Sequence, residues 1–521
     1  MSRSRTVGPL AGVVGALVVV EATSGVIQGF YTPLLTDVAR NLDIHDSDIN
    51  WFEAAQLLLS AIVVPLLARL GDMIGHRKVL IGSLIVTAAA SWGIAFAPSF
   101  WLFTLVWAIQ GFYVVWLPMN VSIIHARARK HPNTAELTSK GAGLIVVALE
   151  AGAIGGALVA GQLGGLLPLW MTLSVPAVLV TIALFVVIFK VEDPGTRAGG
   201  KIDSSGTVLL SLALLAITGG LALARVNGFT PFVWGVILAG GALLWWFVEV
   251  EKRKDDPVID MHLISRPTLW PVILTSALFG VSVLGAQGPL STFAGTNPDE
   301  VGYGLGLASA ERSYLIGAYV LSLLIGAALY ARISRIFQPR PVLIAAAGLV
   351  GAGYLLLVPF HGGVLIVASL MIVAGLGSGA LVAALPATAA AAAPPHQTGV
   401  ATGLTNTTKT LGGAFASAIF ALALASGVDS ETTTAASLSG YQTVWAICGV
   451  TAIIAVGALL TVPKVAFTSA DPDAEGLGEG SDALALEAIG PDVVVSETQR
   501  RPRPPEAPAP QSPDIAQEDE R

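Results

Sequence analysis

Residues 66–81, LLARLGDMIGHRKVLI, join two long apolar segments through a short charged turn. Gly71 and Gly75 supply the backbone freedom that a tight bend requires. A link this short makes the flanking segments antiparallel neighbours. Basic side chains beside an apolar segment mark the cytoplasmic end of a membrane helix. We therefore predict a membrane hairpin in which Asp72 accepts hydrogen bonds from the start of the next helix or pairs with an arginine.

The composition of the whole chain predicts a membrane protein. Its 521 residues are 54% hydrophobic and 12% charged, whereas soluble domains are about 25% charged. Residues 79–124 and 151–189 contain no Asp, Glu, Lys or Arg. Each of these blocks is about twice as long as the roughly 20 residues that cross a bilayer. Each block therefore predicts two spans of an all-α, multi-pass protein embedded in lipid.

The apolar runs predict fourteen spans in total. Loops assigned to the outside are acidic and loops assigned to the inside are basic, so both termini are expected in the cytoplasm and the protein in the plasma membrane. The spans lie near residues 9–33, 51–70, two within 79–124, 141–164, 165–190, 206–224, 232–249, 269–293, 313–331, 342–360, 364–385, 399–425 and 441–462.

The composition changes after the last span. Residues 471–521 hold thirteen acidic and four basic residues, so the net charge of −7 arises from this tail. The segment 464–521 is rich in Pro, Ala, Glu and Asp without helical periodicity, which predicts a disordered acidic cytoplasmic tail. The tail could bind a partner or be solvated without a role. One cysteine, Cys448, excludes an internal disulfide and a multi-cysteine metal site, and we expect no metal, no cofactor, no nucleic-acid partner and a monomer.

The charged turn recurs 263 positions later. The pattern Ala-Arg, Arg and Val-Leu-Ile stands within 68–81 and again within 331–344, with Arg335 in the place of Asp72. The two copies join spans 2 and 3 and spans 10 and 11. This placement is expected when two six-helix halves flank an inserted helix pair.

The turn resembles the loop between the second and third helices of the major facilitator superfamily, which reads Gly-x-Leu-Ala-Asp-Arg-x-Gly-Arg-Lys. Leu70, Asp72, Gly75 and Arg77 match in place. The span 13 sequence GVATGLTNTTKTLGGA and the acidic-basic linker before span 9 resemble the fourteen-helix drug:proton antiporters of that superfamily. The resemblance covers about residues 8–463.

The resemblance implies a fold and a gate. It implies two six-helix bundles plus two inserted helices: residues 1–190 and 269–463 would be the bundles, and residues 191–268 the linker with transmembrane helices 7 and 8. In an outward-facing state, Asp72, Gly75 and Arg77 would tie span 2 to the opposite bundle at the cytoplasmic face, through charge-assisted bonds.

Three positions depart from the antiporter pattern. Trp107 stands where span 4 of the antiporters has an arginine, and Ser24 stands where span 1 has an aspartate. In span 5, AGAIGG replaces the motif Gly-Pro-x-x-Gly-Gly. Its glycines Gly152, Gly155 and Gly156 are expected to allow close helix packing, with the last two facing the opposite bundle.

Two acids lie near the membrane midplane, Glu21 in span 1 and Glu150 in span 5. An ionised side chain there costs about 2.5–3.5 kcal/mol on insertion scales, so its default interpretation is functional. We predict that one of them carries a coupled proton; the alternative is a glutamate kept neutral or hydrogen-bonded for packing. Lys409 in span 13 is a counter-charge or extends towards the cytoplasm.

Several polar and aromatic residues could meet a ligand in a central cavity, although ordinary interhelical hydrogen bonding would also explain each of them. Aromatic rings would suit an aromatic or cationic substrate. The candidates are Ser24, Gln28, Gln110, Tyr113, Asn120 and Gln287.

The sequence favours a transporter over an enzyme, since it holds no Gly-x-Ser-x-Gly, no metal-ligand spacing and no phosphate-binding loop with its lysine. With the resemblance, it predicts an efflux antiporter of multidrug-resistance type, which exports a small amphipathic molecule by alternating access and uses the proton gradient as its energy source. The alternative is a passive facilitator or a ligand sensor with the transporter fold, not coupled to protons. The missing arginine and proline favour this alternative.

Overall fold

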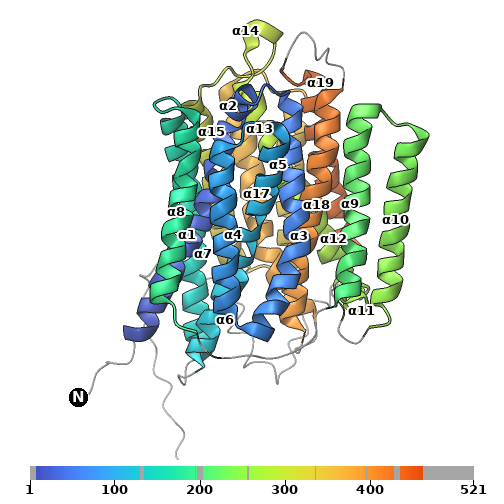
Figure 1. Cartoon of the computed structure of the whole chain (residues 1–521). Helices are drawn as coiled ribbons and strands as arrows, with labels where there is room; N and C mark the ends of the chain where they lie inside the picture. The colour runs from blue at the N-terminus through green and yellow to red at the C-terminus, as the bar shows by residue number, and fades with distance from the viewer. Residues whose placement is uncertain are drawn as a thin grey trace, which may run out of the picture. The chain divides into compact units, whose positions relative to one another are not determined.

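The computed structural model describes residues 8–129, 134–193, 195, 203–254, 257, 259–334, 336–393, 397–426 and 434–461. These residues form helices and no strand (Figure 1). In chain order the helices are α1 (Gly8–Phe30), η1 (Thr32–Leu34), α2 (Leu35–Asn41), η2 (Asp46–Asp48), α3 (Ile49–Ile74), α4 (His76–Phe96), α5 (Phe100–Gln110), η3 (Gly111–Val115), α6 (Trp116–Ala128), α7 (Thr134–Gly164), α8 (Leu169–Lys190), α9 (Ser204–Asn227), α10 (Pro231–Glu251), α11 (Met261–Ile264), α12 (Trp270–Val283), α13 (Gln287–Gly295), α14 (Pro298–Val301), α15 (Ser309–Ile333), α16 (Pro339–Leu357), α17 (Val364–Ala392), α18 (Thr398–Ala425) and α19 (Leu438–Thr461).

Fourteen helical segments of the described chain are long and apolar enough to cross a membrane, which confirms the predicted number of spans. Four of these segments combine more than one helical element. The first comprises α1, η1 and α2, and the second comprises η2 and α3. Span 4 contains the 3₁₀ turn η3 between α5 and α6, and span 9 breaks between α12 and α13. Both breaks lie beside predicted cavity residues, Gln110 and Gln287. The predicted acidic tail lies outside the described residues.

Buried apolar side chains form two clusters. One runs from Val13 to Val191 and the other mainly from Leu210 to Leu459. We call α1–α8 the N-terminal half and α12–α19 the C-terminal half. The inserted helices α9 and α10 pair with each other at one side of the halves, where α9 contacts α18 and α3 (Figure 1).

The turn in residues 66–81 is tighter than predicted. Helix α3 continues through Gly71 to Ile74, and α4 begins at His76. Only Gly75 makes the bend, with a φ of 109° that favours glycine. The prediction for Asp72 is wrong in this conformation, because its carboxylate pairs with His76 Nε2 at 3.2 Å, one turn along the chain. We call the membrane face that carries this turn the motif face, and the opposite one, which carries α2, the α2 face.

The repeat has a common structural role in the two halves. Arg77, at the start of α4, donates to the carbonyls of Ile188 (2.9 Å) and Val191 at the end of α8. Arg340, at the start of α16, donates to the carbonyls of Leu459 (3.2 Å) and Leu460 at the end of α19. Each arginine thus satisfies carbonyls that a helix end leaves without intrahelical donors.

Glycines bring α1 and α7 into backbone contact. A Cβ on Gly25 would lie 1.8 Å from the carbonyl oxygen of Leu149, and one on Gly152 would lie 2.1 Å from that of Ala22. Neither contact leaves room for a side chain. Each glycine faces a carbonyl that lies three residues before the glycine of the opposite helix, so the two helices interlock.

The C-terminal half repeats this arrangement between α12 and α18. A Cβ on Gly280 would lie 1.9 Å from the carbonyl oxygen of Lys409, and one on Gly412 would lie 1.9 Å from that of Ala277. As between α1 and α7, each of these carbonyls lies three residues before the glycine of its own helix. The interlock is thus a second structural repeat, in addition to the paired arginines.

The prediction that Gly155 and Gly156 face the opposite half is wrong. A Cβ on Gly156 would lie 3.0 Å from the Cα of Val26, so this residue packs against α1 of its own half. Nothing in the described structure lies within 4 Å of a Cβ added to Gly155.

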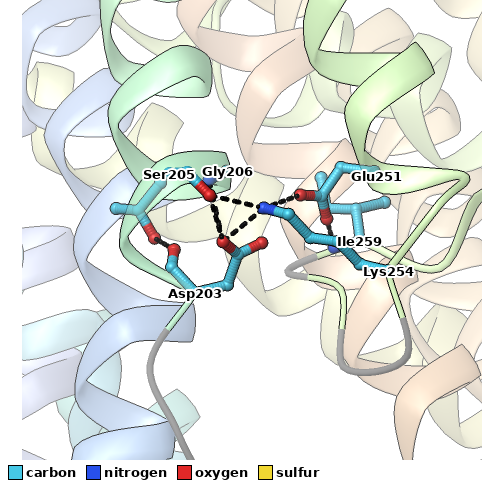
Figure 2. Close-up of polar contacts among 7 residues, drawn as sticks. Asp203, Ser205, Gly206, Glu251, Lys254 and Ile259 are labelled. Carbon is cyan, nitrogen blue, oxygen red and sulfur yellow. Dashed lines mark hydrogen bonds and ion pairs between the residues drawn. The ribbon is translucent and has the colours of Figure 1, made fainter.

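An ion-pair cluster joins the two inserted helices at the motif face (Figure 2). Asp203 caps α9: its Oδ1 accepts from the N–H of Gly206 at 2.9 Å and from Ser205 Oγ at 3.0 Å. Lys254, just after α10, forms an ion pair with Asp203 and donates to Ser205 Oγ at 2.8 Å. The cap and the ion pair therefore share one carboxylate.

The same lysine contacts Glu251, whose side chain is buried (Figure 2). Glu251 Oε2 accepts from the N–H of Ile259 at 3.1 Å, which fixes the segment that leads to α11. A Cβ on Gly206 would lie 2.2 Å from Glu251 Oε1. This glycine therefore allows the two helix ends to come together.

We expect Asp203→Asn to lower the melting temperature of the detergent-solubilised protein by the same amount at pH 5 and pH 8. Burial opposes ionisation, but hydrogen bonds from Lys254 and from the Gly206 N–H outweigh it and lower the pKa of Asp203 to about 2. A carboxyl group with a lowered pKa stabilises the folded protein at every pH above the pKa that the group has in the unfolded chain. This stabilisation is lost only as the pH falls towards 2, the pKa in the folded protein. A lower melting temperature at pH 8 with no change at pH 5 would show that Asp203 is not ionised at pH 5. Glu249→Gln, which removes an exposed ion pair with Lys252, is the control.

Candidate functional site

The two halves are joined at the α2 face by a charged contact that we call the gate pair, Asp37 and Arg312. Arg312 Nη2 donates to Asp37 Oδ2 at 2.9 Å and to Ser309 Oγ at 2.9 Å. Ser309 Oγ in turn donates to Asp37 Oδ2 at 2.9 Å. The arginine is 3% exposed. A cavity of about 520 Å³, lined by residues of both halves, lies at this contact.

Further hydrogen bonds connect the halves at the same face. Ser291 Oγ donates to the carbonyl of Thr32 at 2.5 Å. The N–H of Asp46 donates to the carbonyl of Thr434 at 3.0 Å. These contacts hold the two halves together, so the α2 face is closed in this structure.

Glu21 lies inside the N-terminal half. Its side chain is fully buried, and its Oε1 accepts a hydrogen bond from Asn120 Nδ2 at 2.8 Å. Asn120, on α6, is fully buried as well. Glu21, a predicted proton carrier, thus contacts Asn120, a predicted cavity residue.

Glu150 and Lys409 lie on opposite halves. Glu150 is on α7, Lys409 is on α18, and both are half-buried. They are near enough for an electrostatic interaction, although the described residues include no ion pair between them within 4 Å. The structure therefore brings the predicted counter-charge towards this predicted proton carrier.

Gln110 links four spans of the N-terminal half. Its Nε2 donates to Tyr31 Oη at 3.0 Å and to Ser91 Oγ at 2.9 Å. Gln56 Nε2 donates to Gln110 Oε1 at 3.4 Å and to the carbonyl of Trp107 at 3.1 Å. Trp107, which replaces the antiporter arginine, is buried with its ring centroid 5.0 Å from that of Tyr31. A neutral network and an aromatic ring thus occupy the expected place of the cation.

The other predicted cavity residues differ in exposure. Ser24 and Tyr113 are buried, whereas Gln28 is exposed. Gln287 is half-buried at the break between α12 and α13, where its Nε2 donates to the carbonyl of Val283 at 2.9 Å.

Two features of the site were not predicted from the sequence. Glu53 on α3 is half-buried and is near enough to Tyr113 for an electrostatic interaction. A charge within an apolar span is a signal for such a residue, but its position near the start of span 2 concealed it. The gate pair was missed because its members stand 275 positions apart. In the described part of the chain, no group of three or more His, Cys, Asp and Glu side chains is placed to hold a metal ion.

Comparison with known proteins matches the chain to a family of transporters. The sequence profile of the Major Facilitator Superfamily matches residues 17–417 and 290–505. The cephamycin export protein CmcT of Amycolatopsis lactamdurans is 29% identical over 85% of this chain and 90% of its own length. The puromycin resistance protein pur8 of Streptomyces alboniger is 26% identical over 87% and 90%.

A solved structure shows the same fold. A mutant of the nucleoside transporter NupG superposes with a TM-score of 0.62 over 87% of this chain and all of that chain, at 14% identity. Together with the fourteen membrane helices, these matches define a multi-pass membrane transporter rather than an enzyme, with small molecules as its substrates. The chain belongs to the major facilitator superfamily.

Proposed function

We propose that this protein exports a small amphipathic molecule across the plasma membrane in exchange for protons, with both termini in the cytoplasm. The similarity to a cephamycin export protein and a puromycin resistance protein supports export of antibiotic-like compounds. The observation that carries the proposal is an acid and a base on the two halves, Glu150 on α7 and Lys409 on α18, which are near enough for an electrostatic interaction.

Alternating access supplies the coupling. The two halves pivot about the central site, so the surroundings of Glu150 differ between the two conformations. A proton that binds one conformation more tightly than the other shifts the equilibrium between them. Inward movement of a charge yields about 2.3 kcal/mol per 100 mV of membrane potential. Glu21 is the second proposed carrier, with Gln28, Gln110, Tyr113 and Gln287 as proposed ligand contacts.

The motif face holds the proposed cytoplasmic gate. With the α2 face closed, Asp72 pairs with His76 and Arg77 with carbonyls of its own half. In the opposite conformation we propose that this turn, hinged at Gly75, binds the C-terminal half.

Uptake of radiolabelled puromycin into inverted vesicles, driven by an imposed pH gradient, tests the proposal. We expect Glu150→Gln or Glu21→Gln to lower pH-driven uptake by about tenfold or more, within the usual range of coupling energies. Glu249→Gln, at the exposed end of α10, is the matched control. Because puromycin need not be the substrate, a quinolone and a cephamycin are assayed in parallel. Full uptake with unchanged pH dependence in both glutamate variants would reject the proton-carrier assignment.

The second candidate is a passive facilitator or a ligand sensor with the transporter fold. It is favoured by Trp107, which is buried where the antiporters place an arginine. Under this alternative, one of the compounds equilibrates across the vesicle membrane without accumulating, or binds without crossing, and a proton ionophore has no effect.

A further inference from the structure

Glu21 and Asn120 are joined by one hydrogen bond and leave one atom each unpaired. Asn120 Nδ2 donates to Glu21 Oε1 at 2.8 Å. Within the described structure, Glu21 Oε2 and Asn120 Oδ1 are both buried and have no hydrogen-bond partner. A buried polar atom without a partner costs about 1–3 kcal/mol, so two of them on one contact require an explanation.

If Glu21 were a carboxylate, both unpaired atoms would be acceptors. An ionised carboxylate accepts hydrogen bonds only, and an amide oxygen also accepts. A proton on Oε2 changes the arrangement, because a protonated carboxyl group donates through its O–H. The carboxyl and the amide can then form a ring of two reciprocal hydrogen bonds, which satisfies both atoms with a single proton.

The surroundings of Glu21 supply no counter-charge. The charged or titratable groups on the helices packed against α1 include Glu150 on α7, Lys190 on α8 and His125 and Arg127 on α6. Among the described residues, none of these forms an ion pair with Glu21. A buried, unpaired carboxylate is costly, and such a group is neutralised instead.

The backbone also seals this position. Ala22, the next residue, has its carbonyl against Gly152 of α7, within the interlock that joins these helices. Because Glu21 itself is also fully buried, water reaches it only when the surrounding helices move apart. A proton on Glu21 is therefore held until the N-terminal half rearranges.

We propose that Asn120 is the positioning residue that holds Glu21 in its protonated form, through an acid–amide pair, while the α2 face is closed. This assigns Asn120 to the proton site rather than to the substrate cavity. The link to transport rests on the proposed proton coupling, whereas the protonated pair itself does not.

Infrared spectroscopy of the purified protein in lipid at pH 7 tests the proposal without any substrate. The wild-type spectrum should contain the C=O stretch of a protonated carboxyl group that Glu21→Gln removes. The glutamine can form the same ring with Asn120, so this variant should fold. Asn120→Leu removes both hydrogen bonds and should move the band to higher frequency. Thr23→Val, which removes a nearby buried hydroxyl bonded within α1, should leave the band in place.

Two outcomes would overturn the proposal. If Glu21→Gln removes a carboxylate band instead, Glu21 is ionised and the acid–amide pair does not exist. If Asn120→Leu leaves the carboxyl band unmoved, Asn120 does not hold the group. Should Asn120→Leu fail to fold, the Glu21→Gln difference spectrum still decides the protonation state. Loss of pH-driven transport with an intact band would reject the proposed coupling but not this pair.

Discussion

Gly152→Val should abolish the folded transporter, measured as the monodisperse fraction in size-exclusion chromatography and as transport activity. The Cβ of the valine would lie 2.1 Å from the carbonyl oxygen of Ala22. Side chains that overpack a well-packed interior cost about 1–3 kcal/mol, and more where the backbone has to move. Here the obstacle is the backbone of α1, so both helices would have to separate.

Gly155→Val is the matched control, three residues along the same helix. No described atom lies within 4 Å of its added Cβ, so this variant should fold and remain active. Gly412→Val should fail as Gly152→Val does, because its added Cβ would lie 1.9 Å from the carbonyl of Ala277. Equal tolerance of valine at 152 and 155 would show that α1 and α7 do not interlock.

Arg312→Gln should open the α2 face. The change removes the charge-assisted hydrogen bond to Asp37, and bonds to charged groups contribute about 1.5–3 kcal/mol. Each 1.4 kcal/mol changes the balance between conformations about tenfold. Thr36→Cys reports the opening, since Thr36 is buried, lines the cavity at the gate pair and becomes accessible when the halves separate.

The measurement is the labelling rate of that cysteine by a membrane-impermeant maleimide in intact cells, where the only native cysteine is buried. We expect labelling to be at least about tenfold faster with Arg312→Gln than without it. Glu300→Gln, on α14 at the same face, should leave the rate unchanged. An unchanged rate with Arg312→Gln would show that the gate pair does not hold the α2 face closed.

The membrane architecture could be predicted from sequence because it depends on local quantities. A charge-free block of known length gives the number of spans, and the apolar run around the motif turn gives the hairpin. The fourteen segments of the structure follow from these lengths alone. The paired roles of Arg77 and Arg340 follow from the repeat of 263 positions.

The contacts between distant segments could not be predicted in this way. Gly25 and Gly280 stand 255 positions apart and Gly152 and Gly412 stand 260 apart, so no single displacement reveals both repeats. The partner of Asp72 was mistaken because α3 continues one turn further than the glycines indicated, which brings His76 within reach.

The pairing within the site also depends on three-dimensional packing. Glu21 and Asn120 are 99 positions apart, and they were predicted to have different roles, as a proton carrier and as a cavity residue. Their helices pack within one half, so the side chains meet inside it. Periodicity can place a residue on a face of a helix but does not say which neighbour covers that face.

Proton release on ligand binding tests the proposed coupling most directly. Purified protein in weakly buffered detergent is mixed with puromycin, the quinolone or the cephamycin, whichever the vesicle assay accepts, and the pH is followed with a dye. We expect the wild type to release protons on binding and Glu150→Gln to bind the compound with markedly less release. Binding without proton release in the wild type, or equal release in the wild type and in both glutamate variants, would contradict proton-coupled export through these residues.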